Sequence, residues 1–420
     1  MNTVAALLQA AILFTEATFF HCIFACLYNQ YRPMYPNLYF ALRDLFGVEW
    51  TFLRFVNSFG FFVAISFILA AVTLAAELKR KSSQGLLQPT EIQMMVGEPA
   101  RAGELLLNFL LGFLLGFKIL GLFVMDSSAT EDPQAFIFSG IGSWPAGILL
   151  GLLFAGLKWF EKYKRRLPKP EKRTIRIWPQ DRVGEMTILA LVFGLIGAKL
   201  FDIFENWSDF LKHPSSYLLS PSGLTFYGGL ICAALSIWIY AKKHNIPFWH
   251  LNDAAAPGLM LAYGVGRLGC QVSGDGDWGI ENTAAKPFSW MPDWFWSYTY
   301  PNNVNEAGYP IPGCVGKYCN ELRTPVFPTP VYESIVCILL FVLIWSVRKK
   351  LKTPGTVFAL YLMLNGLERF FIEKIRVNTK LNIFGFQPTQ AEVISTLLFV
   401  AGLVLWIVLR RKDSRPKSTL

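Results

Sequence analysis

The sequence predicts an all-α protein, a polytopic transmembrane bundle of about ten spans with a polar outer segment. Three observations support this. The 420 residues are 53% hydrophobic and 16% charged, whereas a soluble domain usually carries about 25% charged residues. Phenylalanine and tryptophan are abundant, with 36 and 13 copies. Apolar runs of about 20 residues, the length that crosses a bilayer, recur along the chain.

The apolar runs define the predicted spans in order: 4–28, 52–77, 105–125, 141–160, 185–204, 224–241, 251–268, 329–347, 355–373 and 391–409. The first contains Glu16 and His21 and has no flanking charge before it. It can be a span, a re-entrant element or an uncleaved anchor. Since no small-residue cleavage site stands out after it, we expect no cleaved signal peptide there.

Basic clusters orient the spans. They occupy 77–81, 161–173, 241–244, 348–352 and 410–417, and the positive-inside rule places such clusters in the cytoplasm. Segments 125–134, without Lys or Arg, and 270–327 should face outward. An even number of spans then puts both termini inside. The net charge of +10 is explained by these clusters, so we predict no nucleic-acid partner.

Segment 270–327 is too polar to span and too long for a turn. Its aromatic stretch WMPDWFWSYTY, residues 290–300, suits the bilayer–water interface. Cys314 and Cys319 lie on the oxidising side, where they can form a small disulfide-closed loop or remain two free thiols. Four histidines without close spacing argue against zinc, and we predict no metal.

A weak internal repeat links residues 103–120 with 184–201, and 144–153 with 226–235. Gly116 matches Gly197, and Lys118 matches Lys199. Two apolar hairpins can look alike by composition, but the shared Gly-x-Lys favours duplication. The two copies run in the same direction, unlike the inverted repeats of many transporters.

The stretch AYGVGRLGCQVSGDGDWG, residues 262–279, contains the pattern Gly-x-Gly-x-x-Gly. That pattern binds a dinucleotide when a strand precedes it, but here an apolar span precedes it. The alternative is a small-residue helix end that presents Arg267. At 1.5 Å per residue, Arg267 lies about 24 Å along its span, near the outer interface.

A second arginine, Arg369, lies about 22 Å along the span that begins near Pro354. Asn365, Arg369, Glu373 and Arg376 follow helical spacing and should share one helix face. Arg369 and Glu373 can simply pair with each other and reach the interface. Two guanidinium groups at matching depth, however, favour a phosphate site for a phospholipid headgroup.

Other polar residues are predicted at the same level. Tyr332 and Glu333 open the span after the outer segment, and Tyr227 opens another span, where it can also be a plain interface aromatic. Asp275 and Asp277 are weak evidence for a cation site. We expect them to order their loop, with Asp275 pairing with an arginine.

Together, these motifs resemble the prolipoprotein diacylglyceryl transferase family. The stretches that carry the resemblance are SGLTFYGGL (222–230), DAAAPGLMLAYGVGRLGC (253–270) with the following GDGDWG, TPVYES (329–334) and GLERFFIEKIR (366–376). The resemblance covers roughly 50–77 and 184–410. It implies an enzyme of the bacterial inner (plasma) membrane that moves diacylglycerol from phosphatidylglycerol to the lipobox cysteine of pre-lipoproteins and releases glycerol phosphate. It implies no cofactor.

The resemblance also assigns residues. Arg267 and Arg369 match the two essential arginines of the family, and the matching glycines are Gly266, Gly269 and Gly279. Asp275 stands where the family has Glu, while the remaining matches are Tyr332, Glu333, Glu373 and Arg376.

The sequence departs from the family at three positions: Tyr227 replaces His, Cys270 replaces Asn, and Asn365 replaces Tyr. The loop DGDWG also has one extra residue. These departures leave the proton acceptor open between Tyr227, Glu333 and water.

The expected mechanism is attack of the peptide thiolate on a glycerol carbon, with Arg267 and Arg369 stabilising the leaving phosphate. Two alternatives remain. One is a divergent paralogue with another thiol acceptor or lipid donor. The other is an anionic lipid or solute transporter, in which Lys118, Lys199 and Asp202 line a path.

The resulting division of the chain has seven parts. They are an extra N-terminal membrane segment with its outer connection (1–49), the first core span (50–82), an extra helix pair (103–160), core spans with the arginine signature (184–270), a periplasmic head segment (271–327), C-terminal core spans (328–410) and a cytoplasmic tail (411–420).

Overall fold

The computed structural model describes residues 33–121, 140–219, 223, 225–378, 380–382 and 386–413. The predicted span 4–28, the outer loop 125–134 and residues 414–420 of the predicted tail lie outside the described residues.

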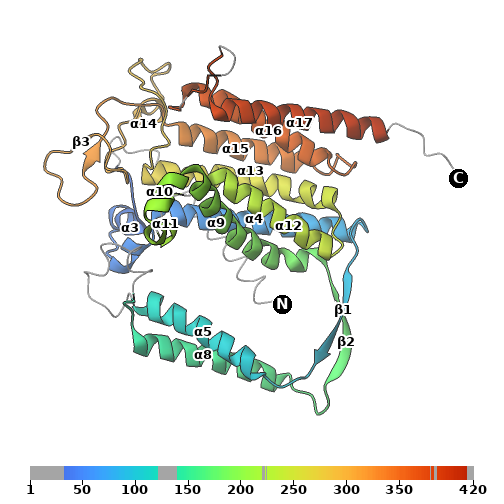
Figure 1. The fold of residues 1–420 in the computed structure, drawn as a ribbon. Helices are drawn as coiled ribbons and strands as arrows, with labels where there is room; N and C mark the ends of the chain where they lie inside the picture. Colours follow the sequence, from blue (N-terminus) through green and yellow to red (C-terminus); the bar gives the residue numbers. More distant parts are fainter. Residues whose placement is uncertain are drawn as a thin grey trace.

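Long helices occupy the positions of the other predicted spans (Figure 1). They are α4 (Ser58–Ser83), α5 (Ala102–Leu115, continued by a π-helical turn Gly116–Leu120), α8 (Trp144–Lys164), α9 (Val183–Glu205), α12 (Phe226–Lys243), α13 (Phe248–Ser273), α15 (Thr329–Val347), α16 (Thr356–Ile372) and α17 (Gln390–Asp413).

Within the described residues, five helical segments are long and apolar enough to cross a membrane by length and composition: Ser58–Ser83, Ala102–Leu120, Pro179–Glu205, Thr329–Val347 and Gln390–Arg411. The other long helices are shorter or more polar; α16, for example, has 17 residues. The described residues are therefore mainly helical with five candidate spans, and the predicted ten are not confirmed.

The short elements complete the chain order. They are α3 (Leu38–Phe46), α10 (Trp207–Lys212), α11 (Pro214–Leu219), α14 (Asp293–Trp296) and the 3-10 turns Thr51–Phe55, Pro179–Arg182 and Glu373–Ile375. Two small antiparallel sheets also occur, β1 (Thr90–Val96) with β2 (Glu171–Ile177), and β3 (Tyr309–Pro310) with β4 (Asn320–Glu321).

The two small sheets depart from the all-α prediction. In the larger one, β1 and β2 form a ribbon whose register pairs Thr90 with Ile177 and Val96 with Glu171. Nearly every side chain of β2 is exposed. The ribbon was missed because a strand without a buried face shows no alternation of apolar and polar residues.

Helix α13 lies at the centre of the bundle, packed against α4 and α15 (Figure 1). Two glycines allow this close approach. A Cβ at Gly269 would lie 3.0 Å from Cβ of Phe62 on α4, and one at Gly264 would lie 3.1 Å from Cβ of Cys337 on α15. Both contacts fix the end of α13 that carries Arg267.

The opposite end of α13 is fixed by a buried carboxylate. Asp253 accepts hydrogen bonds from the backbone N–H groups of Gly355 (2.8 Å) and Phe358 (3.0 Å), at the start of α16. It also pairs with Lys81 of α4 at 3.4 Å. This network holds α4, α13 and α16 in register.

Two helix hairpins are built alike but sit in different places. Helices α9 and α12 pack together within the bundle, whereas α5 and α8 form a hairpin at the far end of the β1–β2 ribbon (Figure 1). A Cβ at Gly116 would collide with the carbonyl oxygen of Ala146, and a Cβ at Gly197 would collide with that of Gly228. In the predicted repeat, these are equivalent positions.

The lysines of the repeat make equivalent contacts as well. Lys118 donates to the carbonyl oxygen of Ile141 at 2.8 Å, and Lys199 donates to that of Gly223 at 3.4 Å. Each acceptor occupies the matching position of its own hairpin. These contacts favour the duplication, which stays a prediction.

The head segment and Met34 share a small core, in which Met34 packs with Tyr298, Tyr300 and Val326. Cys314 and Cys319 form a disulfide there, with 5.6 Å between their Cα atoms.

Candidate active site

The loop after α13 turns sharply at two glycines. Helix α13 ends at Gly274, whose φ of 64° is left-handed, and Gly276 follows with φ 97°. A residue with a side chain is strained in this region. The turn brings Asp277 back toward Arg267, two helical turns before the end of α13.

Gly279 joins this loop to the segment after α16. Its N–H donates to the carbonyl oxygen of Phe327 at 2.8 Å, and the N–H of Ile280 donates to that of Ile375 at 2.8 Å. A Cβ at Gly279 would lie 2.5 Å from the Ile375 oxygen, so only glycine fits. The result is an isolated bridge between Gly279 and Arg376.

Arg376 therefore reaches the site along an extended backbone. Helix α16 ends at Ile372, a 3-10 turn follows, and Arg376 has φ −94° and ψ 153°. The predicted helix face running from Asn365 to Arg376 is wrong beyond Glu373, because α-helical geometry stops before Arg376.

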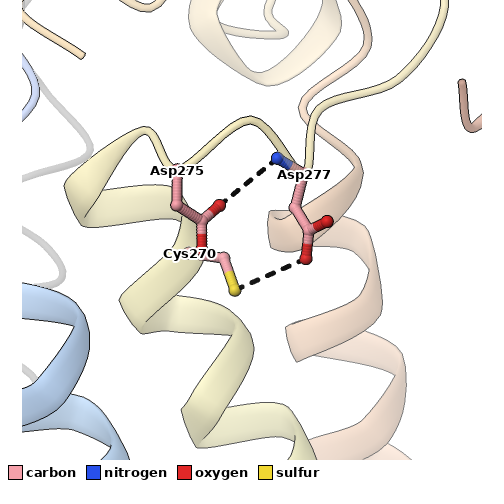
Figure 2. A group of neighbouring side chains, drawn as sticks. All are labelled: Cys270, Asp275 and Asp277. Atoms are coloured by element: carbon pink, nitrogen blue, oxygen red, sulfur yellow. Dashed lines mark hydrogen bonds between the residues drawn. The ribbon is translucent and has the colours of Figure 1, made fainter. Parts of the chain in front are cut away.

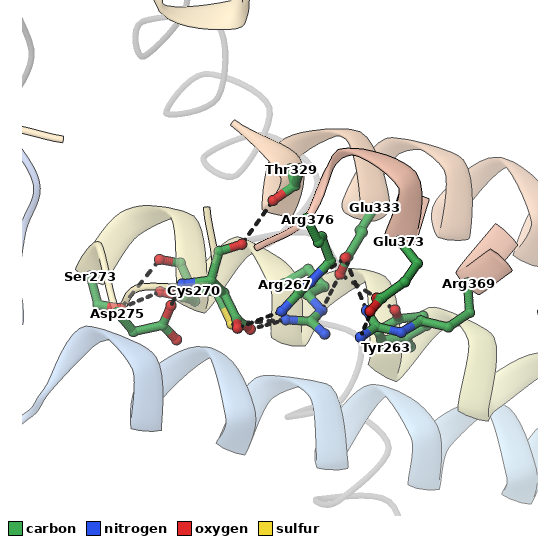
Figure 3. Close-up of polar contacts among 12 residues, drawn as sticks. Tyr263, Arg267, Cys270, Ser273, Asp275, Thr329, Glu333, Arg369, Glu373 and Arg376 are labelled. Atoms are coloured by element: carbon green, nitrogen blue, oxygen red, sulfur yellow. Dashed lines mark hydrogen bonds and ion pairs between the residues drawn. The ribbon is translucent and has the colours of Figure 1, made fainter. Parts of the chain in front are cut away.

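Three arginines converge on one buried carboxylate, that of Glu333 on α15 (Figure 3). Arg267 pairs with it through Nε, Arg369 Nη1 lies 3.3 Å from Oε1, and Arg376 Nη1 lies 2.9 Å from the same oxygen. The Glu333 side chain is fully buried. The Tyr263 hydroxyl donates to Oε2 at 3.4 Å.

Two further carboxylates complete the arginine cluster, which we define as Arg267, Arg369 and Arg376 with their acidic partners. Asp277 pairs with Arg267 and with Arg376, whose Nη2 lies 2.7 Å from Oδ1. Glu373 Oε2 lies 3.1 Å from Arg369 Nη2, and Glu373 Oε1 accepts a hydrogen bond from Thr389 at 2.8 Å.

The cluster balances three guanidinium groups with three carboxylates, Asp277, Glu333 and Glu373. Hydrogen-bonding capacity remains, because each guanidinium carries five N–H donors. Within the described structure, buried Nε of Arg376 has no hydrogen-bond partner. A planar donor array of this kind is suited to phosphate oxygens.

Asp277, rather than Asp275, is the loop carboxylate that pairs with arginine. Asp275 Oδ1 instead accepts the Asp277 N–H at 3.3 Å. This corrects the expectation for Asp275. The left-handed turn at Gly274 and Gly276 brings Asp277, two positions after Asp275, to the arginines.

The two aspartates have opposite electrostatic environments. Burial, together with the neighbouring Asp277 charge, raises the pKa of Asp275 above its ordinary value. Burial also disfavours the Asp277 charge, but Arg267 and Arg376 outweigh it and hold the pKa of Asp277 below its ordinary value.

Cys270, Asp275 and Asp277 offer ligand atoms within 4.8 Å of one another, the spacing of a metal site (Figure 2). Asp277, however, already binds two guanidinium groups. Their positive charges would oppose a cation, so this group is better explained as the link between the loop and the arginines.

Four predicted site residues lie outside the described contacts of the cluster. The ring of Tyr227 contacts Phe226 at the start of α12, with centroids 5.8 Å apart. The Tyr332 hydroxyl donates to the Phe295 carbonyl oxygen at 2.5 Å, tying α15 to the head segment. Asn365 is half-buried on α16. A Cβ at Gly266 would meet open space.

The sequence reasoning missed the roles of Tyr263 and Glu368. Tyr263 lies one helical turn before Arg267, a spacing that could have identified it. Glu368 directly precedes Arg369 and is 7% exposed. A charged residue at membrane depth is the signal in the sequence that could have identified it.

The transporter alternative depended on Lys118, Lys199 and Asp202 lining one path. Lys118 contacts the backbone of its own hairpin, and Lys199 lies 3.8 Å from Asp202 on the same helix. The two lysines belong to different hairpins, so this arrangement does not favour a shared path.

Comparison with known proteins points to one family. The model of the family described as prolipoprotein diacylglyceryl transferase matches residues 140–408, which include the whole arginine cluster. The matched region begins ahead of α8 and leaves out residues 50–77, whereas the sequence motifs alone indicated 50–77 and 184–410.

Curated proteins named phosphatidylglycerol–prolipoprotein diacylglyceryl transferase are similar to the chain. One from Dehalococcoides mccartyi is 30% identical over 237 residues, 56% of this chain and 80% of that protein. One from Leptospira interrogans is 30% identical over 258 residues, covering 55% and 70%. One from Shouchella clausii is 28% identical over 243 residues, covering 57% and 79%.

Proposed function

Since the chain belongs to the prolipoprotein diacylglyceryl transferase family, we propose that it transfers a diacylglyceryl group from phosphatidylglycerol to a pre-lipoprotein. The acceptor is the thiol of the lipobox cysteine, and glycerol phosphate is released. The protein is then a transferase of lipoprotein biosynthesis.

One observation carries this proposal: Arg267 of α13 and, from the end of α16 and the residues just after it, Arg369 and Arg376 meet around Glu333 of α15. Charged groups at membrane depth are costly and usually serve a substrate or ion. Arginine stays charged and binds phosphate through two parallel hydrogen bonds. The natural anion at this depth is the phosphate of a phospholipid headgroup.

At the glycerol carbon one bond forms and one bond breaks, and the acceptor thiol also gives up its proton. A lone pair of the peptide sulfur forms a bond to the glycerol carbon that bears the phosphate, and the C–O bond to that phosphate breaks. The electron pair stays on the phosphate oxygen, which leaves as a monoester. Negative charge therefore grows on the leaving group, where preorganised donors act most strongly. We assign this stabilisation to Arg267, Arg369 and Arg376.

The phosphate of the headgroup must compete with two carboxylates of the protein that already pair with the arginines. Glu333 and Asp277 neutralise the same guanidinium groups that the phosphate would use. We propose that phosphate oxygens occupy the remaining N–H donors, the buried Nε of Arg376 among them. The carboxylates then hold the guanidinium groups in position when the site is empty.

The protein is a multi-pass membrane protein by its family and its apolar helices. We propose about ten spans in the bacterial inner membrane, with both termini in the cytoplasm and the site near the periplasmic face. Two features support this orientation: the arginine cluster lies beside the head segment, and basic clusters such as 348–352 lie at the opposite end.

The acceptor peptide would dock from the outer side, at the aromatic part of the head segment. Phe288 and Trp290 are 54% and 76% exposed, and their rings stack with centroids 5.6 Å apart. Exposed aromatic rings of this kind suit the bilayer–water interface, where a signal peptide would be presented.

The direct test is incubation of the purified protein with labelled phosphatidylglycerol and a lipobox peptide. The expected products are a peptide carrying thioether-linked diacylglycerol and an equal amount of glycerol phosphate. A lipobox peptide with Ser in place of Cys is the matched control.

Complementation of a bacterium depleted of its own transferase separates this function from that of a divergent paralogue. Absence of product with every phospholipid offered, together with failed complementation, would contradict the proposal.

A further inference from the structure

The transfer reaction needs a group that accepts the thiol proton. The three arginines cannot be that group, because their guanidinium groups are already protonated. Glu333 is poorly suited, since its carboxylate contacts three guanidinium groups that stabilise its charge. Tyr227 contacts Phe226 and lies outside the described contacts of the cluster. The inference below rests on the proposed function.

Glu368 is a buried carboxyl group that the mechanism has not used. It lies on α16 next to Arg369 and is 7% exposed. Within the described residues, neither of its side-chain oxygens has a hydrogen-bond partner. Buried polar groups are nearly always hydrogen-bonded, so an exception requires an explanation.

Glu368 is also electrostatically coupled to the arginine cluster. Its charge interacts with that of Glu333 and with those of Arg369, Arg267 and Arg376. The titratable groups that interact with it from the packed elements are Tyr263 and Arg267 of α13, Glu333 and Cys337 of α15, Arg369 of its own helix, and Arg376.

Glu368 and Glu333 therefore differ in their contacts. Glu333 contacts every arginine of the cluster and acts as their common anchor. Glu368 lies within the field of the same arginines but has no described hydrogen bond. A carboxylate without donors takes up a proton more readily than one held by guanidinium groups, and this is the property a general base needs.

We propose that the Glu368 carboxylate accepts the proton of the acceptor cysteine thiol as its sulfur attacks phosphatidylglycerol. The S–H bond breaks and its electron pair forms the S–C bond to the glycerol carbon. The C–O bond breaks and its electron pair leaves on glycerol phosphate. The proton then passes from Glu368 to the departing phosphate or to water, which restores the carboxylate.

The test uses the full-length protein with Glu368→Gln, which keeps the shape of the side chain and removes the base. Removal of a general base costs about 10²–10⁴-fold in rate. The matched control is Glu171→Gln, an exposed carboxylate on β2. Expression, gel-filtration behaviour and phosphatidylglycerol binding are measured for each variant, so that a folding defect is recognised.

A second substrate separates a chemical role from a structural one. A lipobox peptide with selenocysteine in place of cysteine is already ionised at neutral pH and needs no base. We expect Glu368→Gln to be strongly impaired with the cysteine peptide and close to wild type with the selenocysteine peptide. With the cysteine peptide, its kcat/KM should rise with pH as the thiol, whose pKa is about 8.5, ionises in solution.

Three outcomes would overturn the inference: an equal loss with both peptides, an unchanged rate with the cysteine peptide, or a pH profile identical to that of wild type. If Glu368→Gln does not fold, Glu368→Asp is used with the same two peptides. A rate loss confined to the cysteine peptide again supports the inference. Inactivity of the wild type toward both peptides would contradict the proposed function itself.

Discussion

Arg376 and Asp277 form an ion pair, with 2.7 Å between Nη2 and Oδ1, although 99 residues separate them in the sequence. The pair joins the loop after α13 to the segment after α16. Arg267 binds the same aspartate from inside α13. The positions of the Arg267 and Arg376 guanidinium groups therefore depend on α13, on the loop after it and on the segment after α16. Gly279 joins that loop to that segment.

Substitution of Arg267 by lysine should abolish most of the transferase activity. Arg267 uses Nε for Glu333 and Nη1 for Asp277, and the compact ammonium of lysine does not reproduce these spaced donors or the planar fork that binds phosphate. By analogy with other oxyanion donors, we expect a loss of about 10²–10³-fold, or about 2.7–4 kcal/mol of barrier. The measurement is kcat/KM with a lipobox peptide, with exposed Arg323→Lys as the control. Full activity of Arg267→Lys would count against the phosphate site.

Glu333→Gln should destabilise the protein and change its response to lipid. Removing one partner of a buried ion pair costs about 3–5 kcal/mol, and here three guanidinium groups lose their common partner. An anionic headgroup can replace the missing charge. Phosphatidylglycerol should therefore raise the thermal midpoint more in Glu333→Gln than in wild type, whereas neutral diacylglycerol should not. Equal shifts for both lipids would contradict this.

Asp275→Asn and Asp277→Asn should have opposite effects on stability at neutral pH. The pKa of Asp277 is lowered in the folded protein, so its charge stabilises the fold above the unfolded value of about 3.9 and stops doing so as the pH falls through the folded pKa. Asp277→Asn should therefore be less stable than wild type at neutral pH, with a difference that disappears in acid.

The pKa of Asp275 is raised, so its protonated form favours folding at low pH and its charge opposes folding once the pH exceeds the folded pKa. Asp275→Asn should thus be more stable than wild type at neutral pH and equal to it in acid. Thermal unfolding in detergent from neutral pH down to about pH 3 tests both variants. The same sign for both would show that the assignment of the two aspartates is wrong.

Removal of the α5–α8 hairpin should leave the transferase site intact. Thr90 and Ile177 are paired across the ribbon, so an Asn-Gly turn can replace residues 91–176. We expect the shortened protein to retain activity with a lipobox peptide. The arginine cluster lies elsewhere, in α13 and the loop after it, α15, and α16 with the segment that follows it. Because the family match begins at residue 140, loss of activity despite normal folding would assign the hairpin a part in catalysis.

The long helices could be predicted from the sequence because each one depends on the apolar residues of its own segment. A run of about 20 apolar residues has few alternatives to a membrane helix, and the described long helices coincide with such runs. Depth along a helix is also local, and this is why Arg267 and Arg369 could be placed at one level from residue spacing. The structure adds Glu333 as the carboxylate on which both converge.

The details of the site depend on loops, whose geometry is not local. The pairing of Asp277 instead of Asp275 is set by left-handed Gly274 and Gly276, and a count along the sequence does not contain that turn. Arg376 reaches the cluster on an extended backbone, which forms an isolated β-bridge with Gly279. The β1–β2 ribbon lacked a signal since nearly all of its second strand is exposed.

The matched contacts of the two hairpins have a consequence for how each hairpin folds. One hairpin lies beside the bundle and the other at the far end of the β1–β2 ribbon, yet the Gly-to-carbonyl contact and the Lys-to-carbonyl contact occur in both (Figure 1). These contacts lie within each hairpin, so they do not depend on the helices around it. Such a hairpin keeps its shape through contacts within itself, so we expect it to fold equally well when it is joined to another place in a chain.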